Sequence, residues 1–247
     1  MRVSFQKSIA QCSKLAELIF FPSLCELCSR LLEHPDEKVV CRTCLQGIKQ
    51  RGKNYCLCCG RFFDVSSEPH FCARCVKQPP SFSIHRSCGR YEDKLKDFII
   101  LYKYRKFRIL GTLLAEFAFK TLGKDEDLWW NVEAVIPVPL HPVKEKRRGF
   151  NQARLIARRL ADYKNVELME GYLLKIKNTP PQTSLEANER LKNLKRAFCV
   201  RGAEKLEGKV VLLVDDVFTT GSTLQECSSE LRKAGVKEVR ALTLAQA

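Results

Sequence analysis

The sequence predicts an α/β protein, in which two small cysteine modules precede a mainly parallel sheet flanked by helices. Three observations support this fold class. Ten of the 13 cysteines lie between residues 12 and 75. Beyond them, short apolar strand patterns alternate with amphipathic helix patterns. The most apolar of these strands, Val210–Val214, runs directly into two aspartates and then into a loop of Thr, Gly and Ser.

The N-terminal cysteines form an internal repeat. Both sets have the pattern C-x2-C-x12-C-x2-C, and the second follows the first by 31 residues (56 − 25 = 31). The first set is Cys25, Cys28, Cys41 and Cys44, and the second is Cys56, Cys59, Cys72 and Cys75. Two such knuckles complete a tetrahedral thiolate site for zinc. We therefore expect two structural zinc ions in a small domain over residues 1–80, which depends on the metal for its stability.

Two alternatives stay open for these cysteines: an iron–sulfur cluster, and zinc sites in which knuckles pair across the two modules. Cys58 lies inside the second module's first knuckle and is surplus to a four-ligand site. His34 and His70 precede the third cysteine of each module, but the eight cysteines already satisfy two ions. The N-terminus does not resemble a signal peptide, so we expect a cytoplasmic protein, and in that reducing compartment paired cysteines usually bind metal.

Charge and targeting features narrow the class of protein. The chain has 43 Lys and Arg against 28 Asp and Glu, a formal net charge of +15. This excess suits a partner rich in phosphate, whether nucleic acid or a small molecule, although a solubilising basic surface is the plainer alternative. The apolar stretch Leu15–Phe21 is short and carries Glu17, unlike a signal peptide. No run is long enough for a membrane span, so we expect no membrane insertion.

The second domain is expected over residues 81–247, after the proline pair Pro79-Pro80. In chain order we expect a strand at Ile84–Tyr91, a helix through Leu95 and Tyr102, a helix from Leu110, a strand at Val135–Val138, a helix at Asn151–Tyr163, the strand Val210–Val214, a helix at Leu224–Ala234 and a strand at Val239–Leu244. Apolar residues three and four apart indicate the helices. Strands that are apolar on both faces, with helices between them, indicate a parallel sheet covered on both sides.

The candidate ligand site lies where the Val210–Val214 strand ends. Ligands of parallel α/β sheets bind at the carboxyl ends of the strands, which is where Asp215 and Asp216 stand. The loop that follows, Thr219, Thr220, Gly221, Ser222 and Thr223, leads into a helix N-terminus, where backbone N–H groups favour an anion. Carboxylates accept hydrogen bonds from vicinal hydroxyls. The motif therefore suits a ribose 5-phosphate.

Three other interpretations fit less well. An apolar strand that ends in Asp also occurs in P-loop nucleotide hydrolases, but the chain has no G-x4-G-K-[ST] sequence. A receiver domain clusters carboxylates at strand ends but is not expected to continue with Thr-Thr-Gly-Ser-Thr. A plain strand-to-helix turn does not explain two adjacent carboxylates, which are costly to bury without partners.

Basic residues follow the strand at Val135–Val138. Residues 135–160 carry seven basic side chains and one acid, Glu145. We expect Lys144, Lys146, Arg147 and Arg148 in a loop beside the site, where cations stabilise a departing pyrophosphate. Two further segments have two interpretations each. Lys103–Arg108 either stacks a base or forms a helix with a buried aromatic face, and Thr179–Arg190 is either a mobile hood or a surface loop.

The segment from Asp215 to Thr223 resembles the phosphoribosyl pyrophosphate signature of type I phosphoribosyltransferases. Ile136–Pro142, Arg148–Gln152, Thr179–Gln182 and the doubled cysteine pattern resemble the ComF family, which is linked to competence for natural DNA transformation. This resemblance implies a double zinc ribbon fused to a phosphoribosyltransferase fold. It implies ribose hydroxyls on Asp215 and Asp216, a 5-phosphate on residues 219–223, and Mg²⁺ bound with the phosphoribosyl pyrophosphate.

The resemblance also implies a role in handling incoming single-stranded DNA in the cytoplasm. Two functions follow as hypotheses. In the first, the protein is a pentosyl-transferring enzyme. In the second, it is a non-catalytic phosphoribosyl sensor or an adaptor that holds single-stranded DNA or a DNA-uptake helicase. Homo-oligomerisation is compatible with both, and no acceptor-recognition residue can be read from the sequence.

Overall fold

The computed structural model describes residues 23–34, 37–64, 68–105, 107–179 and 196–247. It has two compact units, Met1–Ile48 and Lys49–Ala247. The apolar stretch Leu15–Phe21 and nearly all of the expected hood, from residue 180 on, lie outside the described residues.

The first unit is built around the first cysteine module. A bridge between Leu24 and Leu31 closes the loop of the first knuckle, and α2, Arg42–Gln46, begins directly after the third cysteine. The Glu37 carboxylate accepts the backbone N–H of Arg42 at 2.7 Å. It also accepts the N–H groups of two residues before it. One acidic side chain thus holds the loop between the two knuckles.

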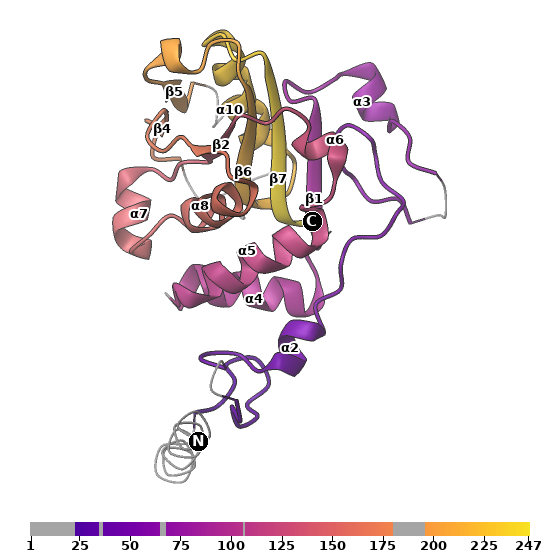
Figure 1. The fold of residues 1–247 in the computed structure, drawn as a ribbon, viewed down its shortest axis with the longest axis vertical. Helices are drawn as coiled ribbons and strands as arrows, with labels where there is room; N and C mark the ends of the chain where they lie inside the picture. The colour runs from indigo at the N-terminus through magenta and orange to yellow at the C-terminus, as the bar shows by residue number, and fades with distance from the viewer. Residues whose placement is uncertain (1–22, 35–36, 65–67, 106, 180–195) are drawn as a thin grey trace, which may run out of the picture. The chain divides into compact units, whose positions relative to one another are not determined.

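The second unit contains a five-stranded parallel sheet among its described residues, in the order β1-β7-β6-β2-β3. The strands are β1 Ile84–Arg90, β2 Ala134–Pro137, β3 Glu167–Leu168, β6 Val210–Phe218 and β7 Glu238–Gln246. The apolar run Val210–Val214 is buried, as a central strand requires. Figure 1 shows β6 beside β7, with which it pairs in parallel. The predicted parallel α/β sheet is confirmed.

Helices cover both faces of this sheet. They are α4 Asp93–Tyr104, α5 Ile109–Leu122, α6 Glu126–Trp129, α7 Pro142–Arg148, α8 Gln152–Lys164 and α10 Ser222–Lys233. Helix α8 packs on β2 and β6 and against α5, whereas α10 packs on β6 and β7 (Figure 1). Successive side chains of a strand point to opposite faces. Leu213 accordingly joins a cluster with Leu224 and Leu231 of α10, while Leu212 is buried outside that cluster.

Strand β6 is longer than its apolar run indicates. It continues to Phe218, because β7 extends equally far and pairs with it: Asp215 lies opposite Thr243, and Phe218 lies opposite Gln246. The two aspartates therefore lie within the last part of the strand. The sequence-based end of the strand at Val214 is wrong, because its charged residues still pair with a neighbouring strand.

The basic segment after β2 is helix α7, where the sequence analysis expects a loop. His141 caps the helix by accepting the N–H of Val143, Pro142 occupies the first turn, and Gly149 ends the helix at φ 86°. These are ordinary start and stop signals. A further difference is the antiparallel pair β4 Leu173–Lys175 and β5 Phe198–Val200, which joins short segments that no local pattern marks.

The second cysteine module repeats the first. Its bridge joins Tyr55 to Phe62, and its helix α3 spans Ala73–Lys77, each 31 residues after its counterpart (55 − 24, 62 − 31 and 73 − 42). It belongs to the same compact unit as the sheet, and its Cys56, Cys58 and Cys75 are buried in the cluster on the α10 side. The expected domains, 1–80 and 81–247, stay a prediction about independent folding.

Candidate functional site

The eight repeat cysteines gather into two groups of four, one in each module. Within each group the sulfur atoms all lie within 4.8 Å of one another. The Sγ–Sγ distances are 3.9 Å for Cys25 and Cys44 and 3.7 Å for Cys28 and Cys41. Sulfurs around a tetrahedral zinc with Zn–S bonds of about 2.3 Å are about 3.8 Å apart. The donors and spacing fit one zinc ion per module, with the knuckles paired within each module.

The two central carboxylates point to opposite sides of β6. Asp216 forms an ion pair with Lys103 of α4, with Oδ1 and Nζ 2.8 Å apart. Asp215 faces the α10 side, where Lys175 and Cys227 are near enough to affect its ionisation or to be affected by it. Both side chains are only partly buried. A ligand that lies across the end of β6 can therefore reach both carboxylates.

Asp215 holds its proton unusually tightly. Burial raises the pKa of Asp215 to about 7, and the Asp216 carboxylate acts in the same direction. The backbone N–H of Asp216 donates to the Asp215 carboxylate at 2.8 Å, and Lys103 and Lys175 also oppose the rise. The described residues include no ion-pair partner within 4.0 Å of this carboxylate. Perturbed carboxyl groups of this kind are frequent in ligand sites.

Lys103 is buried against the site but keeps its charge. Burial lowers the pKa of this lysine, but the Asp216 carboxylate raises it more, and the net pKa lies above the usual value. Lys103 begins the segment Lys103–Arg108, for which no pairing with an aspartate is predicted. The pairing joins residues 113 positions apart (216 − 103), and α4 brings them together.

The turn that follows β6 leads into the N-terminus of α10. Gly221 is the N-cap of α10 at φ 80° and has no side chain to cap the helix, while the Thr220 hydroxyl accepts the N–H of Ser222 at 3.4 Å. A Cβ at Gly221 would lie 2.7 Å from Cζ of Phe218, so only glycine fits. The hydroxyls of Thr220 and Ser222 lie 2.7 Å apart, and Thr219 is exposed. Of the five predicted phosphate-loop residues, Ser222 and Thr223 are thus the first residues of the helix.

Cations of α7 and β4 affect one another's ionisation, and Lys175 of β4 also affects that of Asp215. Burial lowers the pKa of Lys144, and the charges of Lys175, Arg148 and Arg147 lower it further. The Arg148 guanidinium donates to Gln152 at 3.1 Å and lies 5.9 Å from the Tyr104 ring centroid. Within the described ranges, no acid forms an ion pair with Arg148. Such a cluster is suited to bind an anion.

Other cations of this region have no contact with the site in the described part of the chain. Lys146 is exposed, and no contact in the described part of the chain joins it to the site. Arg154 binds Glu145 at 2.8 Å, and Arg158 binds Glu170 at 2.9 Å, which agrees with a solvated helix face. The sequence analysis misses Lys175, because the β4–β5 pair that positions it has no local signal.

Within the described residues, no helix is both long and apolar enough to cross a bilayer.

Comparison with known proteins agrees with this architecture. A family model described as phosphoribosyl transferase domain matches residues 113–247. Competence protein F of Haemophilus influenzae is 33% identical over 92% of this chain and 99% of its own length. DNA utilization protein YhgH of Salmonella typhimurium is 28% identical over 90% of this chain and 96% of its own length.

Among solved structures, the purine phosphoribosyltransferase of Pyrococcus horikoshii is 21% identical over 54% of this chain and 73% of that chain, with a TM-score of 0.36. So low a score adds nothing to the family match. The match to competence protein F spans both the cysteine modules and the α/β sheet. The chain therefore belongs to the ComF family, and its residues 113–247 form a phosphoribosyl transferase domain.

Proposed function

We propose that this protein is a phosphoribosyltransferase that binds phosphoribosyl pyrophosphate with Mg²⁺ at the carboxyl end of β6. The observation that carries the proposal is the position of Asp215, a partly exposed carboxylate with no ion-pair partner among the described residues, four positions before Thr219, where the turn into α10 begins. Carboxylates there accept hydrogen bonds from sugar hydroxyls. The turn that follows the end of β6 offers backbone N–H groups to a phosphate.

Each part of the site has a task in this proposal. Asp215 and Asp216 bind the two ribose hydroxyls from the two sides of β6, and Lys103 keeps Asp216 ionised. Residues 219–223 bind the 5-phosphate. Lys144 and Arg148 face the pyrophosphate, on which negative charge grows as its bond to the sugar breaks. The positive charges of Lys144 and Arg148 are available to stabilise the pyrophosphate as this bond breaks.

Mg²⁺ fits the donors present, because carboxylate oxygens and pyrophosphate oxygens are the hard ligands that this ion prefers. When bound, it would supply further charge stabilisation for the pyrophosphate. The two cysteine groups would hold one structural Zn²⁺ each. Four thiolates leave no open coordination position for catalysis.

Calorimetry with phosphoribosyl pyrophosphate and MgCl₂ tests the pocket directly. We expect the double variant Asp215→Asn with Asp216→Asn to bind about 100-fold more weakly or worse. Asparagine keeps the side-chain shape but loses two charge-assisted hydrogen bonds, which are worth about 1.5–3 kcal/mol each. The control is Asp93→Asn, an exposed aspartate at the start of α4 that pairs with Lys49. Equal affinity in the double variant and the wild type would refute the pocket.

One contact favours a second function. In the Lys103–Asp216 ion pair, Lys103 occupies one oxygen of Asp216, a side chain that is predicted to bind the sugar. In that case the protein is a non-catalytic phosphoribosyl sensor. A pyrophosphate-release assay with a panel of nucleobases and single-stranded DNA separates the two functions. Release with any acceptor selects the enzyme, whereas binding without release selects the sensor.

We further propose a role in DNA handling during competence. The names of the two relatives, competence protein F and DNA utilization protein, support it, as does the net charge of +15. Phosphate contacts release counterions, so we expect single-stranded DNA affinity to fall steeply between about 50 and 200 mM salt. An affinity that stays flat over this range in fluorescence anisotropy would contradict a basic contact face. Pull-down of a DNA-uptake helicase would test the partner separately.

A further inference from the structure

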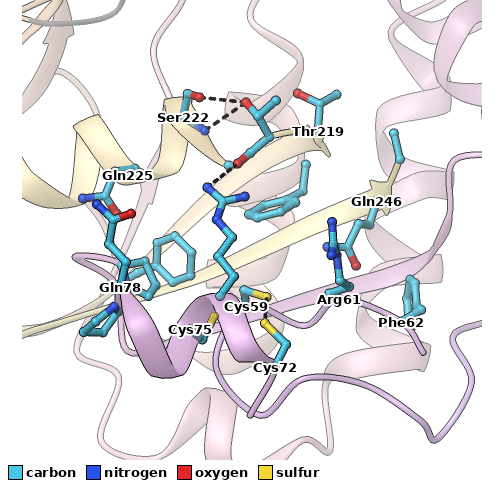
Figure 2. A pocket seen from close by; sticks show the side chains of 18 of the residues that line it. Cys59, Arg61, Phe62, Cys72, Cys75, Gln78, Thr219, Ser222, Gln225 and Gln246 are labelled. Atoms are coloured by element: carbon cyan, nitrogen blue, oxygen red, sulfur yellow. Dashed lines mark hydrogen bonds between the residues drawn. The ribbon is translucent and has the colours of Figure 1, made fainter. Parts of the chain in front are cut away.

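A cavity of about 510 Å³ lies beside the second group of metal-binding cysteines. Two of the four cysteines, Cys59 and Cys72, line it, and both are half-buried. Their Sγ atoms are 3.9 Å apart. Figure 2 shows both cysteines on the module side of the cavity, with Thr219 and Ser222 of the turn on the other side. A small molecule in this cavity can therefore contact two ligand cysteines of the folded module.

Zinc-bound cysteines remain nucleophiles. The thiolate is the reactive form of cysteine, and a bound metal keeps its ligands deprotonated. Thiolates attack disulfides and form a mixed disulfide first. A second thiolate nearby can then displace the attached group and close a disulfide, in which the two sulfurs are about 2.05 Å apart. Cys59 and Cys72 are neighbours of this kind.

Arginines make this cavity favourable for an anion. Arg61, Arg74 and Arg90 line it with one acid, Asp64, which Arg90 binds at 2.6 Å. Arg61 and Arg74 form no ion pair in the part of the chain that the structure describes. Arg74 makes one long contact, 3.5 Å to the carbonyl of Thr220. A zinc ion with four thiolates is net negative, and these two guanidinium groups offset the repulsion that an incoming anion would meet.

The first module differs in both charge and exposure. The repeat places Arg30 at the position of Arg61 (61 − 31), but Thr43 at the position of Arg74 (74 − 31). Cys28, a ligand of the first module, is exposed. If exposure alone decided reactivity, any disulfide would react with the first module before the second. An anionic disulfide should instead react first where the additional arginine is.

We propose that this cavity is a modification site, at which an anionic low-molecular-weight disulfide oxidises the second metal group. One thiolate of the Cys59–Cys72 pair attacks a sulfur of the disulfide. The new S–S bond forms as the old one breaks, and a small thiolate leaves with the electron pair. The other cysteine then attacks the modified sulfur and expels the second small thiolate. The two cysteines lose two electrons, the small disulfide gains them, and Zn²⁺ leaves a site with only two thiolates.

Oxidation at this site acts on a module that is packed against the sheet. The Cys59 carbonyl lies 2.8 Å from Nδ1 of the buried His85 in β1. Loss of the metal would therefore loosen a contact between the module and the sheet. Neither Asp215 nor Asp216 lines the cavity, and no reacting group belongs to the proposed phosphoribosyl pocket. The modification site is thus independent of that pocket.

The test compares two disulfides on the full zinc-loaded chain: oxidised glutathione, which is anionic, and 2-hydroxyethyl disulfide, which is uncharged. A chromogenic chelator follows zinc release, and mass spectrometry of alkylated peptides assigns each new disulfide to a module. We expect oxidised glutathione to link Cys59 to Cys72 before it oxidises the first module. The uncharged reagent should oxidise the first module first, because Cys28 is exposed.

Arginine variants identify the cause of this selectivity. Arg61→Ala with Arg74→Thr removes both free charges, and its second change copies the first module. We expect this variant to react with oxidised glutathione at Cys59 and Cys72 about tenfold more slowly or worse, while its rate with the uncharged disulfide stays within about twofold of the wild type. Arg30→Ala is the matched control and should leave the rate at the second module unchanged.

Three results would overturn the proposal. In the first, oxidised glutathione oxidises neither module, or oxidises the first module before the second. In the second, both disulfides attack the wild-type modules in the same order. In the third, the arginine variant slows both reagents equally, since charge then does not select the disulfide. The comparison of reagents on the wild-type protein needs no variant to fold.

Discussion

The two cysteine modules have the same ligands at the same spacing, yet they are placed in different structures. The first is the centre of a small unit that ends at Ile48, and the second is packed into the α/β unit. The residues that form the bridge, the helix and the sulfur cluster of the second module each follow their counterparts in the first module by 31 positions. The difference must therefore come from residues other than the ligands.

Those residues join the second module to the sheet. The backbone of His85 donates to the Cys58 carbonyl at 2.7 Å, and its Nδ1 lies 2.8 Å from the Cys59 carbonyl. Its ring stacks on Phe218, with centroids 4.2 Å apart, and Phe218 in turn limits position 221 to glycine. A continuous series of contacts thus runs from the second metal group to the phosphate turn. The same metal chemistry can stabilise a separate module or support a ligand site.

Loss of one cysteine ligand should show the largest contrast. We expect Cys56→Ser to remove one zinc ion and to lower the Tm of the α/β unit by about 10 °C or more, because metal binding contributes directly to folding. Phosphoribosyl pyrophosphate affinity should fall with it. Cys25→Ser, the counterpart in the first module, should also remove one zinc ion but leave the Tm of the α/β unit unchanged. Metal analysis and calorimetry check this, and equal effects on the α/β transition would break the comparison.

Phe218 carries the contact between the second module and the turn. We expect Phe218→Ala to destabilise the protein by about 3–5 kcal/mol, since it leaves a cavity between His85 and Gly221. Phe218→Leu keeps most of the volume and should cost less. Denaturation measures the stability of each variant, and titration measures its affinity for a ligand of the turn. If affinity falls in proportion to stability, the coupling between the second module and the turn is supported. Unchanged ligand affinity in a folded Phe218→Ala protein would argue against it.

The α/β unit also contains a group that destabilises it. Because burial raises the pKa of Asp215 to about 7, the native state holds this proton more tightly than the unfolded chain does. Its contribution to stability therefore falls as pH rises from about 4 to 7. We expect Asp215→Asn to stabilise the ligand-free protein by about 1–3 kcal/mol at pH 8, and by less at pH 5.

Denaturation of both proteins between pH 5 and 8 measures this difference. The neutral buried His85, whose pKa burial lowers to about 3, affects both proteins equally and cancels. A variant that is less stable than the wild type at pH 8 would mean that the carboxylate stabilises the fold and is not held there for a ligand.

The smallest effect concerns an acid that the repeat places in both modules, Glu37 and Glu68 (68 − 37 = 31). Slight burial raises the pKa of Glu37, but N–H donors from Arg42, His34 and Glu33 lower it more, and the net shift is downward. Its stabilising effect is present at neutral pH and lost as pH falls through its pKa. We expect Glu37→Gln to cost the first unit about 0.5–1 kcal/mol. Zinc retention during chelator titration reports this, and Glu68→Gln should retain zinc as the wild type does.

Local patterns predicted much of the protein because local physics produces those features. The spacing of the eight cysteines indicated both metal groups, and the apolar run at Val210–Val214 indicated the central strand. The start and stop signals of α7 were also present in His141, Pro142 and Gly149, so the expected loop there was an avoidable error. The β4–β5 pair was not predictable, since its strands have three residues each and pair across a long segment.

The sequence by itself determined the ligands of two metal groups, the chain order of the main strands and helices, and the acids and turn of the proposed sugar pocket. Each of these depends on residues close together in the chain. Only the tertiary structure decided that Lys103 pairs with Asp216, that Lys175 approaches Asp215, and that the second module encloses a cavity with Gln246. These contacts join distant segments, and packing of helices and modules on the sheet brings them together.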